Sequence, residues 1–471
     1  MTPIEAVDAY LADSAEERLA EFVQFLRIPS IGVLSAHHED VRAAAEWLAE
    51  RMRAIGLEHV ETCQTGGHPI VYADWLHAEG APTVIVYAHY DVQPVDPLEE
   101  WVRPPFEPRI EEGRVFARGA ADDKGQVHLH LWAARAWLAT AGRLPINVRY
   151  VIEGEEEAGS PNFEAWLVAN RERLEADLVV VTDTGFFEGN EPAVTVGLRG
   201  NTYLQVDVTG PSQDLHSGSF GGLVQNPANA LVRILASLRD GEGRVTVPGF
   251  YEDVRELAPA EQAALAALPF DEQAFAASIG VSELFGEPGH IPVVRRGARP
   301  TLDICGLWSG FQGEGTKTII PAHAHAKLSA RSVPDMDPQR IFELLRDAIL
   351  AVDAPGVEVA VTLHDTMRPF VVSVEHPAAQ LAARCLREVF AQEPWYIREG
   401  GSIGAVASFD KVLGKPTVLL GFTNPDDRAH SPNESLVLAN YEGGARTVAR
   451  YWAALAEDAG LPHLVPMGAS T

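Results

Sequence analysis

The stretch TVIVYAHYDVQP, residues 83–94, decides the fold. Its first six residues form an apolar run, which ends at His89 and Asp91. A strand that lacks alternation between apolar and polar residues is typical of a parallel sheet covered on both faces. Because residues two apart on a strand share a face, Asp91 can lie behind His89 and fix the orientation of its ring.

Three further apolar runs end in the same way, and helical stretches alternate with them. They are VRYVIEG (148–154), LVVVT (178–182) and PTVLLGF (416–422), and they are followed by Glu156 with Glu157, by Asp183 and by His430. Asp122, in ARGAADDKG (117–125), instead precedes a helical segment. This order predicts an α/β fold with a mostly parallel sheet and helices on both faces. In such sheets ligands bind beyond the carboxyl ends of the strands.

Carboxylates and imidazoles gathered at one edge of a sheet predict a metal site, because like charges repel there unless a cation is present. In the acidic run 153–157, one of two adjacent glutamates can bind metal while its neighbour takes a proton from the attacking water. Taken singly, each motif has an ordinary alternative: a solvated acidic loop, a helix cap at Asp122 or Asp123, or a surface histidine. Together they predict a binuclear metal-dependent hydrolase.

The length of 471 residues predicts two domains, and the pattern changes near residue 198. One-faced strands at 200–210, 323–334 and 357–364, with helices at 227–238 and 338–350, predict an inserted α+β module with an antiparallel sheet. Residues 240–300 are expected to form a long surface excursion within it. We therefore expect a catalytic domain in two parts, with these boundaries: 1–197 for its first part, 198–375 for the inserted domain, and 376–471 for its second part.

The composition limits the partners of the protein. A formal net charge of −29 disfavours binding to nucleic acid or to a membrane surface. The 3 cysteines are far apart and do not predict a disulfide framework. The acidic N-terminal sequence does not resemble a signal peptide, and no apolar run approaches the ~18 residues of a membrane span. We expect a cytoplasmic protein.

Six motifs occur in an order that resembles one enzyme family. They are AHYDVQP, ARGAADDKG, EGEEEAGS, DLHSG, REGGSIG and RAHSPNE. The chain resembles the dinuclear metallopeptidase family of carnosinases, cytosolic non-specific dipeptidases, carboxypeptidase G and succinyl-diaminopimelate desuccinylase. The resemblance runs from about residue 20 to residue 450, and the dipeptidase branch, which carries Asp at the position of Asp183, matches best.

The resemblance implies two divalent metal ions per subunit, zinc in the first place, with manganese or cobalt as alternatives. Their implied ligands are His89 and Asp183 for one ion, Glu157 and His430 for the other, and Asp122 as the bridge between them. Glu156 is implied as the general base and Asp91 as the partner that orients His89.

For the inserted domain, the resemblance implies a lid that also forms a homodimer. His216, in DLHSG, would then act in the active site of the neighbouring subunit. Arg331 would bind the terminal carboxylate of the substrate, Gly401 and Ser402 would form the substrate loop, and His364 would be a further lid histidine whose surroundings depart from the family pattern.

We therefore expect a hydrolase that cleaves the peptide bond of dipeptides with a free C-terminal carboxylate. The nearest alternative is an N-acyl-amino-acid deacylase of the acetylornithine or succinyl-diaminopimelate type with the same metal centre. A catalytically inactive metal- or peptide-binding protein would be expected to lack Glu156 or a ligand, and none is missing. An acidic structural scaffold gives no reason for five motifs at one edge of a sheet.

Overall fold

The computed structural model describes residues 1–457. Within them the chain divides into two compact units. The first unit comprises Met1–Val196, Val372–Ile397 and the chain from Ile403 onward. The second unit comprises Gly197–Val371 together with the short segment Arg398–Ser402. The first unit is thus assembled from segments that lie before and after the second one in the sequence.

The first unit is built on a sheet whose central strands run parallel. In spatial order these are β6 (Asn147–Glu153), β3 (Thr83–His89), β7 (Leu178–Val181) and β17 (Thr417–Leu419). Antiparallel strands extend both sides of this centre: β2 (Ile70–Trp75), β1 (Glu58–Cys63) and β8 (Ala193–Leu198). The predicted α/β fold is confirmed, and its apolar runs form the parallel centre.

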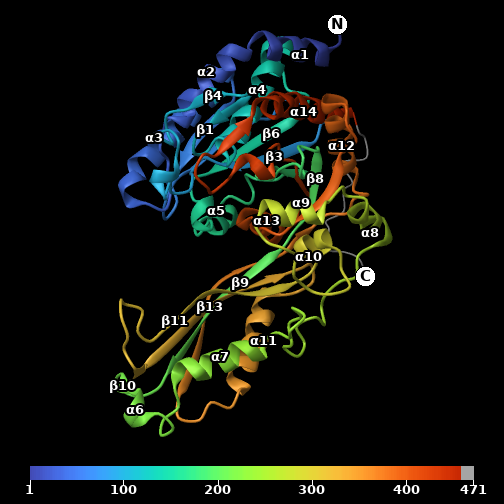
Figure 1. Ribbon diagram of the computed structural model, residues 1–471. Coiled ribbons are helices and arrows are strands. Elements are labelled where there is room, and N and C mark those ends of the chain that lie inside the picture. Colours follow the sequence, from blue (N-terminus) through green and yellow to red (C-terminus); the bar gives the residue numbers. More distant parts are fainter. Residues whose placement is uncertain (458–471) are drawn as a thin grey trace. The chain divides into compact units, whose positions relative to one another are not determined.

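Helices cover both faces of this sheet (Figure 1). On one face lie α4 (Lys124–Ala141) and α14 (Leu438–Glu457), and on the other lie α5 (Phe163–Ala169) and α13 (Gly404–Leu413). Tyr87 of β3 packs against Phe163 and Phe409, with ring centroids 5.3 and 5.5 Å apart. The other α-helices of this unit are α1 (Pro3–Asp13), α2 (Ala15–Leu26), α3 (His38–Ile55) and α12 (Pro377–Phe390).

The second unit contains an antiparallel sheet with helices on one face. Its strands, in spatial order, are β11 (Thr301–Ser309), β13 (His323–Ser332), β9 (Gly200–Thr209) and β14 (Glu358–Met367). Burial alternates along β9, where Leu204, Val206 and Val208 belong to a core with residues of α7 (Pro227–Ser237) and α11 (Pro338–Ala351). This alternation is the pattern that predicted the inserted α+β module.

Shorter elements complete the described chain. The excursion 240–300 holds α8 (Pro259–Ala266), α9 (Glu272–Ser278) and α10 (Pro292–Ala298), which the sequence reading did not predict. The short strands are β4 (Arg109–Glu111), β5 (Arg114–Phe116), β10 (Leu215–His216), β12 (Ile319–Ile320), β15 (Phe370–Val371), β16 (Trp395–Glu399) and β18 (Ser435–Val437), and α6 spans Ser217–Phe220.

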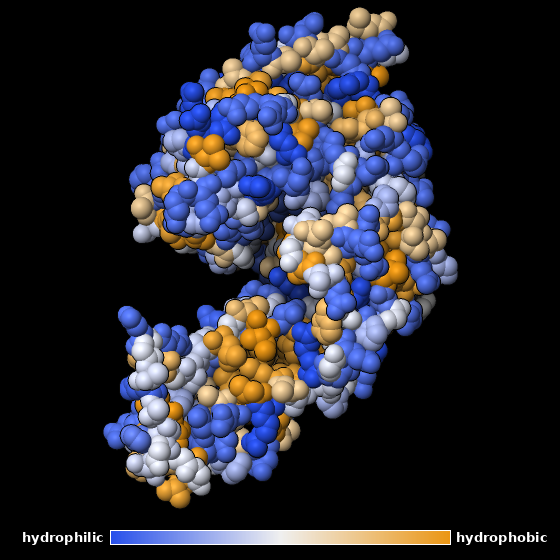
Figure 2. Space-filling view, in the orientation of Figure 1, coloured by the Kyte–Doolittle hydropathy of each residue, from blue (hydrophilic) through white to orange (hydrophobic). Residues whose placement is uncertain are grey.

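The visible surface is mostly hydrophilic, and hydrophobic side chains gather only in limited areas (Figure 2). One of these areas lies on the second unit, in the region of α7. Within residues 1–457, no helix is both long and apolar enough to cross a membrane.

Candidate metal centre

The parallel strands bring the predicted acids and imidazoles to one edge of the sheet. His89 is the last residue of β3 and pairs in register with Glu153 at the end of β6. The acidic turn after β6 forms the 3-10 helix η3 (Glu156–Ala158), and Asp183 follows β7 by two residues. Asp122 lies just before α4, and His430 lies in the loop between β17 and β18. Because parallel strands end at the same edge, segments distant in sequence converge there.

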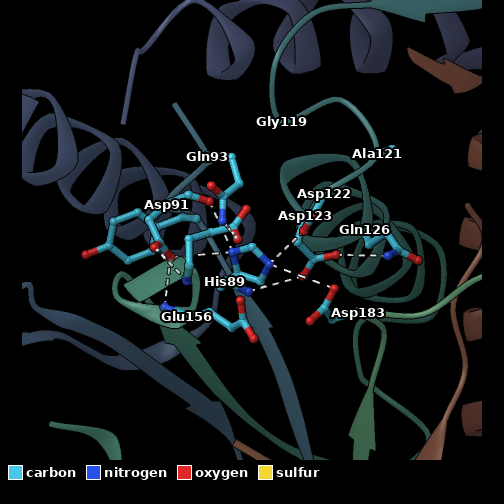
Figure 3. A network of polar contacts seen from close by, with 12 residues as sticks. His89, Asp91, Gln93, Gly119, Ala121, Asp122, Asp123, Gln126, Glu156 and Asp183 are labelled. Carbon is cyan, nitrogen blue, oxygen red and sulfur yellow. Dashed lines mark hydrogen bonds and ion pairs between the residues drawn. The ribbon is translucent and has the colours of Figure 1, made fainter. Parts of the chain in front are cut away.

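The first group of potential ligand atoms contains His89, Asp122 and Asp183 (Figure 3). The His89 Nε2 atom lies 3.0 Å from Asp122 Oδ1 and 3.9 Å from Asp183 Oδ1. All three ligand atoms lie within 4.8 Å of one another. His89 is fully buried, while Asp122 and Asp183 are partly exposed. The group can therefore offer one nitrogen and two carboxylate oxygens to one ion.

The second group contains Asp122, Glu157 and His430. The His430 Nε2 atom lies 2.8 Å from Asp122 Oδ2 and 3.2 Å from Glu157 Oε2. Asp122 thus belongs to both groups and turns a different oxygen toward each imidazole. That is the arrangement of a carboxylate that bridges two cations.

The electrostatics of this edge favour cations. Burial, followed by the charge of Asp122, raises the pKa of Glu157 to about 7. Hydrogen bonds to Asp122 and Glu157 raise the pKa of His430 to about 11. Burial alone would raise the pKa of Asp122, but His430 and His89 outweigh it and hold that pKa below its usual range. These shifts reflect carboxylates crowded at one edge, an arrangement that a cation would stabilise.

A buried oxygen atom of Glu157 shows whether the residues of the site fit a metal ion. Glu157 Oε1 is buried and has no hydrogen-bond partner, although Glu157 Oε2 accepts a hydrogen bond from Gln93 Nε2 at 2.6 Å. A buried carboxylate oxygen without a partner is costly in protein, and a divalent cation would supply that partner. The donor set of imidazole nitrogens and carboxylate oxygens suits zinc, manganese or cobalt. The residues fit the implied ions.

Asp91 supports both sides of the site (Figure 3). Its Oδ1 atom accepts a hydrogen bond from the amide of Glu156 at 3.2 Å, and its Oδ2 atom accepts one from the amide of Glu157 at 3.1 Å. The His89 Nδ1 atom lies 3.4 Å from Asp91 Oδ1 and 3.1 Å from the Asp91 carbonyl oxygen. Asp91 therefore fixes the turn of the two glutamates as well as contacting the imidazole.

Glu156 lies outside both groups of ligand atoms. Burial raises the pKa of Glu156 well above its usual value, and the negative charge of Asp183 raises it further. A carboxylate with a raised pKa that is not itself a ligand is suited to accept a proton. The structure thus distinguishes the two neighbouring glutamates, since only Glu157 shares a group with His430.

Three contact residues were missed in the sequence. Gln93 bonds Glu157, as described above, and lies within the stretch that decides the fold. Asp123 makes no cap on α4; its Oδ2 atom instead accepts the amide of His89 at 3.1 Å, and its Oδ1 atom accepts Gln126 Nε2 at 2.9 Å. Glu434 is fully buried and bonds the loop of Asp122. All three residues occur in the sequence motifs quoted above, and their place in those motifs was the only indication that they contact the site.

The remaining predicted residues belong to the second unit. Arg331 of β13 donates from Nη1 to Ser402 Oγ at 2.9 Å, and Ser402 Oγ in turn donates to the Arg199 carbonyl oxygen. The neighbouring residue Gly401 is also bonded within this unit, because its carbonyl oxygen accepts a hydrogen bond from the amide of Arg199 at 3.1 Å. The structure therefore joins Arg331 to the predicted substrate loop.

The two predicted histidines of the second unit have separate surroundings. His216, at the end of β10, is exposed and accepts the amide of Gly218 on Nδ1 at 3.0 Å. His364, on β14, is exposed and has Nε2 3.4 Å from Gln205 Oε1.

Comparison with known proteins gives the class of the protein. The model of the family described as "Peptidase family M20/M25/M40" matches residues 85–454, which is most of the chain. The chain belongs to this family and is a peptide hydrolase. The family expected from the six motifs is thereby confirmed.

Individual relatives refine this likeness. The chain is 32% identical to the Cys-Gly metallodipeptidase dug1 of Schizosaccharomyces pombe, over 85% of each chain. It is 31% identical to the human Beta-Ala-His dipeptidase, over 83% of this chain and 78% of the relative. Among solved structures, the di-peptidase Dug1p of Saccharomyces cerevisiae is similar with a TM-score of 0.85, 28% identity and coverage of 98% of this chain and 100% of the other. A metallo-carboxypeptidase of this family from Sulfolobus solfataricus is similar with a TM-score of 0.84, 32% identity and coverage of 93% and 99%.

Proposed function

We propose that this peptide hydrolase is a dinuclear metallo-dipeptidase, which cleaves dipeptides with a free C-terminal carboxylate. The observation that carries the proposal is Asp122, whose two oxygens face two different imidazoles in two groups of ligand atoms. The dipeptidase names of the two relatives support the substrate class.

In this proposal His89 and Asp183 would hold one ion, Glu157 and His430 would hold the other, and Asp122 would serve both. When bound, the two ions would polarise the scissile carbonyl and lower the pKa of the attacking water toward ~7. We propose zinc as the ion, with manganese or cobalt as the alternatives that the same donor set accepts.

In this proposal side chains of the protein transfer the proton. Glu156 takes the proton from the attacking water and passes it to the leaving amine, because it is the carboxylate that is not committed as a ligand. Asp91 holds the amide of Glu156 at 3.2 Å and thereby keeps the base at a fixed place beside the ligands. Its contact with the ring of His89 gives it the orienting role as well.

In this proposal residues of the second unit bind the carboxylate of the substrate. The planar guanidinium of Arg331 can bind both oxygens of a carboxylate at once, and its bond to Ser402 keeps it beside the loop of Gly401. We assign His364 a lesser, substrate-facing role in the same unit. If a carboxylate anchor sets the substrate length, the enzyme cleaves dipeptides well, tripeptides poorly and dipeptide amides hardly at all.

We further propose that the second unit is a lid that also forms a homodimer, and that His216 acts in the active site of the partner subunit. Support comes from β11, an edge strand of its sheet. Three of its apolar side chains, Ile304, Leu307 and Trp308, are 52%, 54% and 37% exposed, which is the composition of a protein interface. The net charge of −29 disfavours nucleic-acid and membrane-surface partners, and we propose a cytoplasmic enzyme.

One experiment tests this function. The purified protein is analysed for metal, stripped, and reloaded in turn with zinc, manganese and cobalt. Each form is then assayed on dipeptides, on the matching dipeptide amides and on N-acyl amino acids. We expect two ions per chain and activity on the free dipeptides alone. Equal rates on a dipeptide and its amide would refute the carboxylate anchor, and a preference for N-acyl amino acids would favour the deacylase.

A further inference from the structure

A single buried carboxylate, Glu434, accepts four hydrogen bonds from the loop that carries Asp122. Glu434 is 0% exposed. Its Oε1 atom accepts the amides of Ala121 and Asp122 at 2.9 and 3.0 Å. Its Oε2 atom accepts the amide of Gly119 at 2.9 Å and the Nη1 atom of Arg118 at 2.7 Å. Both oxygens are therefore fully used, and all four donors lie in residues 118–122.

These bonds link the chain segments that hold the proposed metal ligands. Glu434 lies four residues after His430, whose Nε2 atom is 2.8 Å from Asp122 Oδ2. Arg118 also donates from Nη2 to the carbonyl oxygen of Pro94 at 3.0 Å, and Pro94 ends the stretch that begins with the strand of the first histidine. Glu434 therefore contacts the Asp122 loop, and Arg118 of that loop contacts the segment that ends at Pro94.

We propose that Glu434 is a positioning residue, which sets the distance between the ligand atoms of Asp122 and His430 and so controls metal affinity. The inference rests on the proposed two-metal function. A ligand binds well only if its atoms are held in place before the ion arrives, and residues that orient ligands typically change metal affinity ~10–100-fold. Because Glu434 and His430 share one loop, the carboxylate connects two of the three proposed ligands of one ion, Asp122 and His430.

The substitution Glu434→Gln removes the charge but keeps the shape. A glutamine amide has one accepting oxygen, and its nitrogen donates. In either orientation, two of the four donors lose their acceptor and face another N–H group. The loop that carries Asp122 would then relax without any loss of packing volume.

Asp427 provides a matched control in the same loop. It is also 0% exposed, and it lies three residues before His430. Its Oδ1 atom accepts Arg114 Nη1 at 2.7 Å, and its Oδ2 atom accepts the amide of Asn424 at 2.7 Å. Asp427→Asn therefore removes a buried, hydrogen-bonded carboxylate whose partners lie in β5 and in its own turn.

The test is a titration of the metal-free full-length protein with Mn²⁺ by calorimetry, with thermal unfolding measured in parallel. Electron paramagnetic resonance of the loaded protein then reports spin coupling between two ions that share a carboxylate. We expect Glu434→Gln to weaken Mn²⁺ binding ~10–100-fold and to reduce the coupled signal, while Asp427→Asn loses stability but keeps wild-type affinity.

Two results would overturn the inference. One is wild-type affinity and coupling in Glu434→Gln, which would leave Glu434 a purely structural residue. The other is an equal loss of affinity in Asp427→Asn, which would show a general effect of loop stability. If Glu434→Gln does not fold, Glu434→Asp gives the same comparison, because it keeps the charge but withdraws it by one methylene. If the wild-type protein itself bound fewer than two ions, the proposed function would fail as well.

Discussion

Replacing Asp91 with asparagine should weaken metal binding and catalysis together. The Asp91 carboxylate accepts two amides, those of Glu156 and Glu157, and lies 3.4 Å from the ring nitrogen of His89. Asparagine has the same shape but only one accepting oxygen, so one amide must lose its acceptor and face a side-chain N–H group. The change therefore loosens the turn that carries the proposed base and one proposed ligand.

The size of the effect follows from the bonds that are lost. A hydrogen bond to a charged group typically contributes ~1.5–3 kcal/mol. Since ~1.4 kcal/mol corresponds to a factor of ten, one lost bond of this kind predicts a ~10–150-fold effect. This range agrees with the ~10–100-fold effect that is typical of residues that orient metal ligands. We therefore expect Asp91→Asn to cause a combined loss of ~10–100-fold, divided between metal affinity and kcat.

The assay measures metal affinity by competition with a chelator, and kcat at saturating metal. Asp177→Asn serves as the control, because Asp177 Oδ2 accepts the amide of Thr83 at 2.8 Å at the opposite end of β3. The control should lose stability without losing metal affinity. Wild-type metal affinity and kcat in Asp91→Asn would refute the reasoning, as would an equal loss of affinity in the control.

Four further outcomes are expected. Glu156→Gln should keep two metals per chain and lower kcat by ~10²–10⁴, measured by metal analysis and steady-state kinetics. Mixed dimers of His216→Ala and Glu156→Gln subunits should regain activity that neither parent has, and an active monomer in sedimentation would contradict this. Arg331→Ala should keep its metals but lose ~10–150-fold of the preference for a free dipeptide over its amide. Burial would raise the pKa of Asp8, but Arg450 outweighs it and lowers that pKa. Asp8→Asn should therefore lower Tm at neutral pH, and thermal scans should show this difference shrinking as the pH falls below the unfolded pKa of about 3.9.

The strand-end residues could be predicted because two simple rules apply to them. An apolar run marks a buried strand, and parallel strands end at one edge, so the convergence of His89 and Asp183 follows from the sequence. The acidic run predicted that one of two adjacent glutamates binds metal and the other accepts a proton. The assignment of Glu156 as the base and Glu157 as the ligand came from the resemblance to a family, and it remains a proposal that metal analysis of the two glutamine variants can test.

The supporting contacts could not be predicted, because they depend on the path of loops. Asp123 stands where a helix cap is expected, yet its side chain accepts the amide of His89. Glu434 accepts hydrogen bonds from donors that lie 312 or more residues away in the sequence, and Gln93 donates to a carboxylate that lies 64 residues away. No periodic pattern encodes such pairings.

Each unit gathers partly buried charged groups of one sign at its candidate site, and this indicates what each unit binds. In the first unit the carboxylates of Asp122, Asp183 and Glu157 are crowded around two imidazoles. In the second unit, burial, followed by the charge of Arg331, lowers the pKa of Arg199 to about 10. A buried excess of one sign is costly unless a ligand of the other sign is bound. We therefore expect the first unit to bind cations and the second to bind an anion such as a carboxylate.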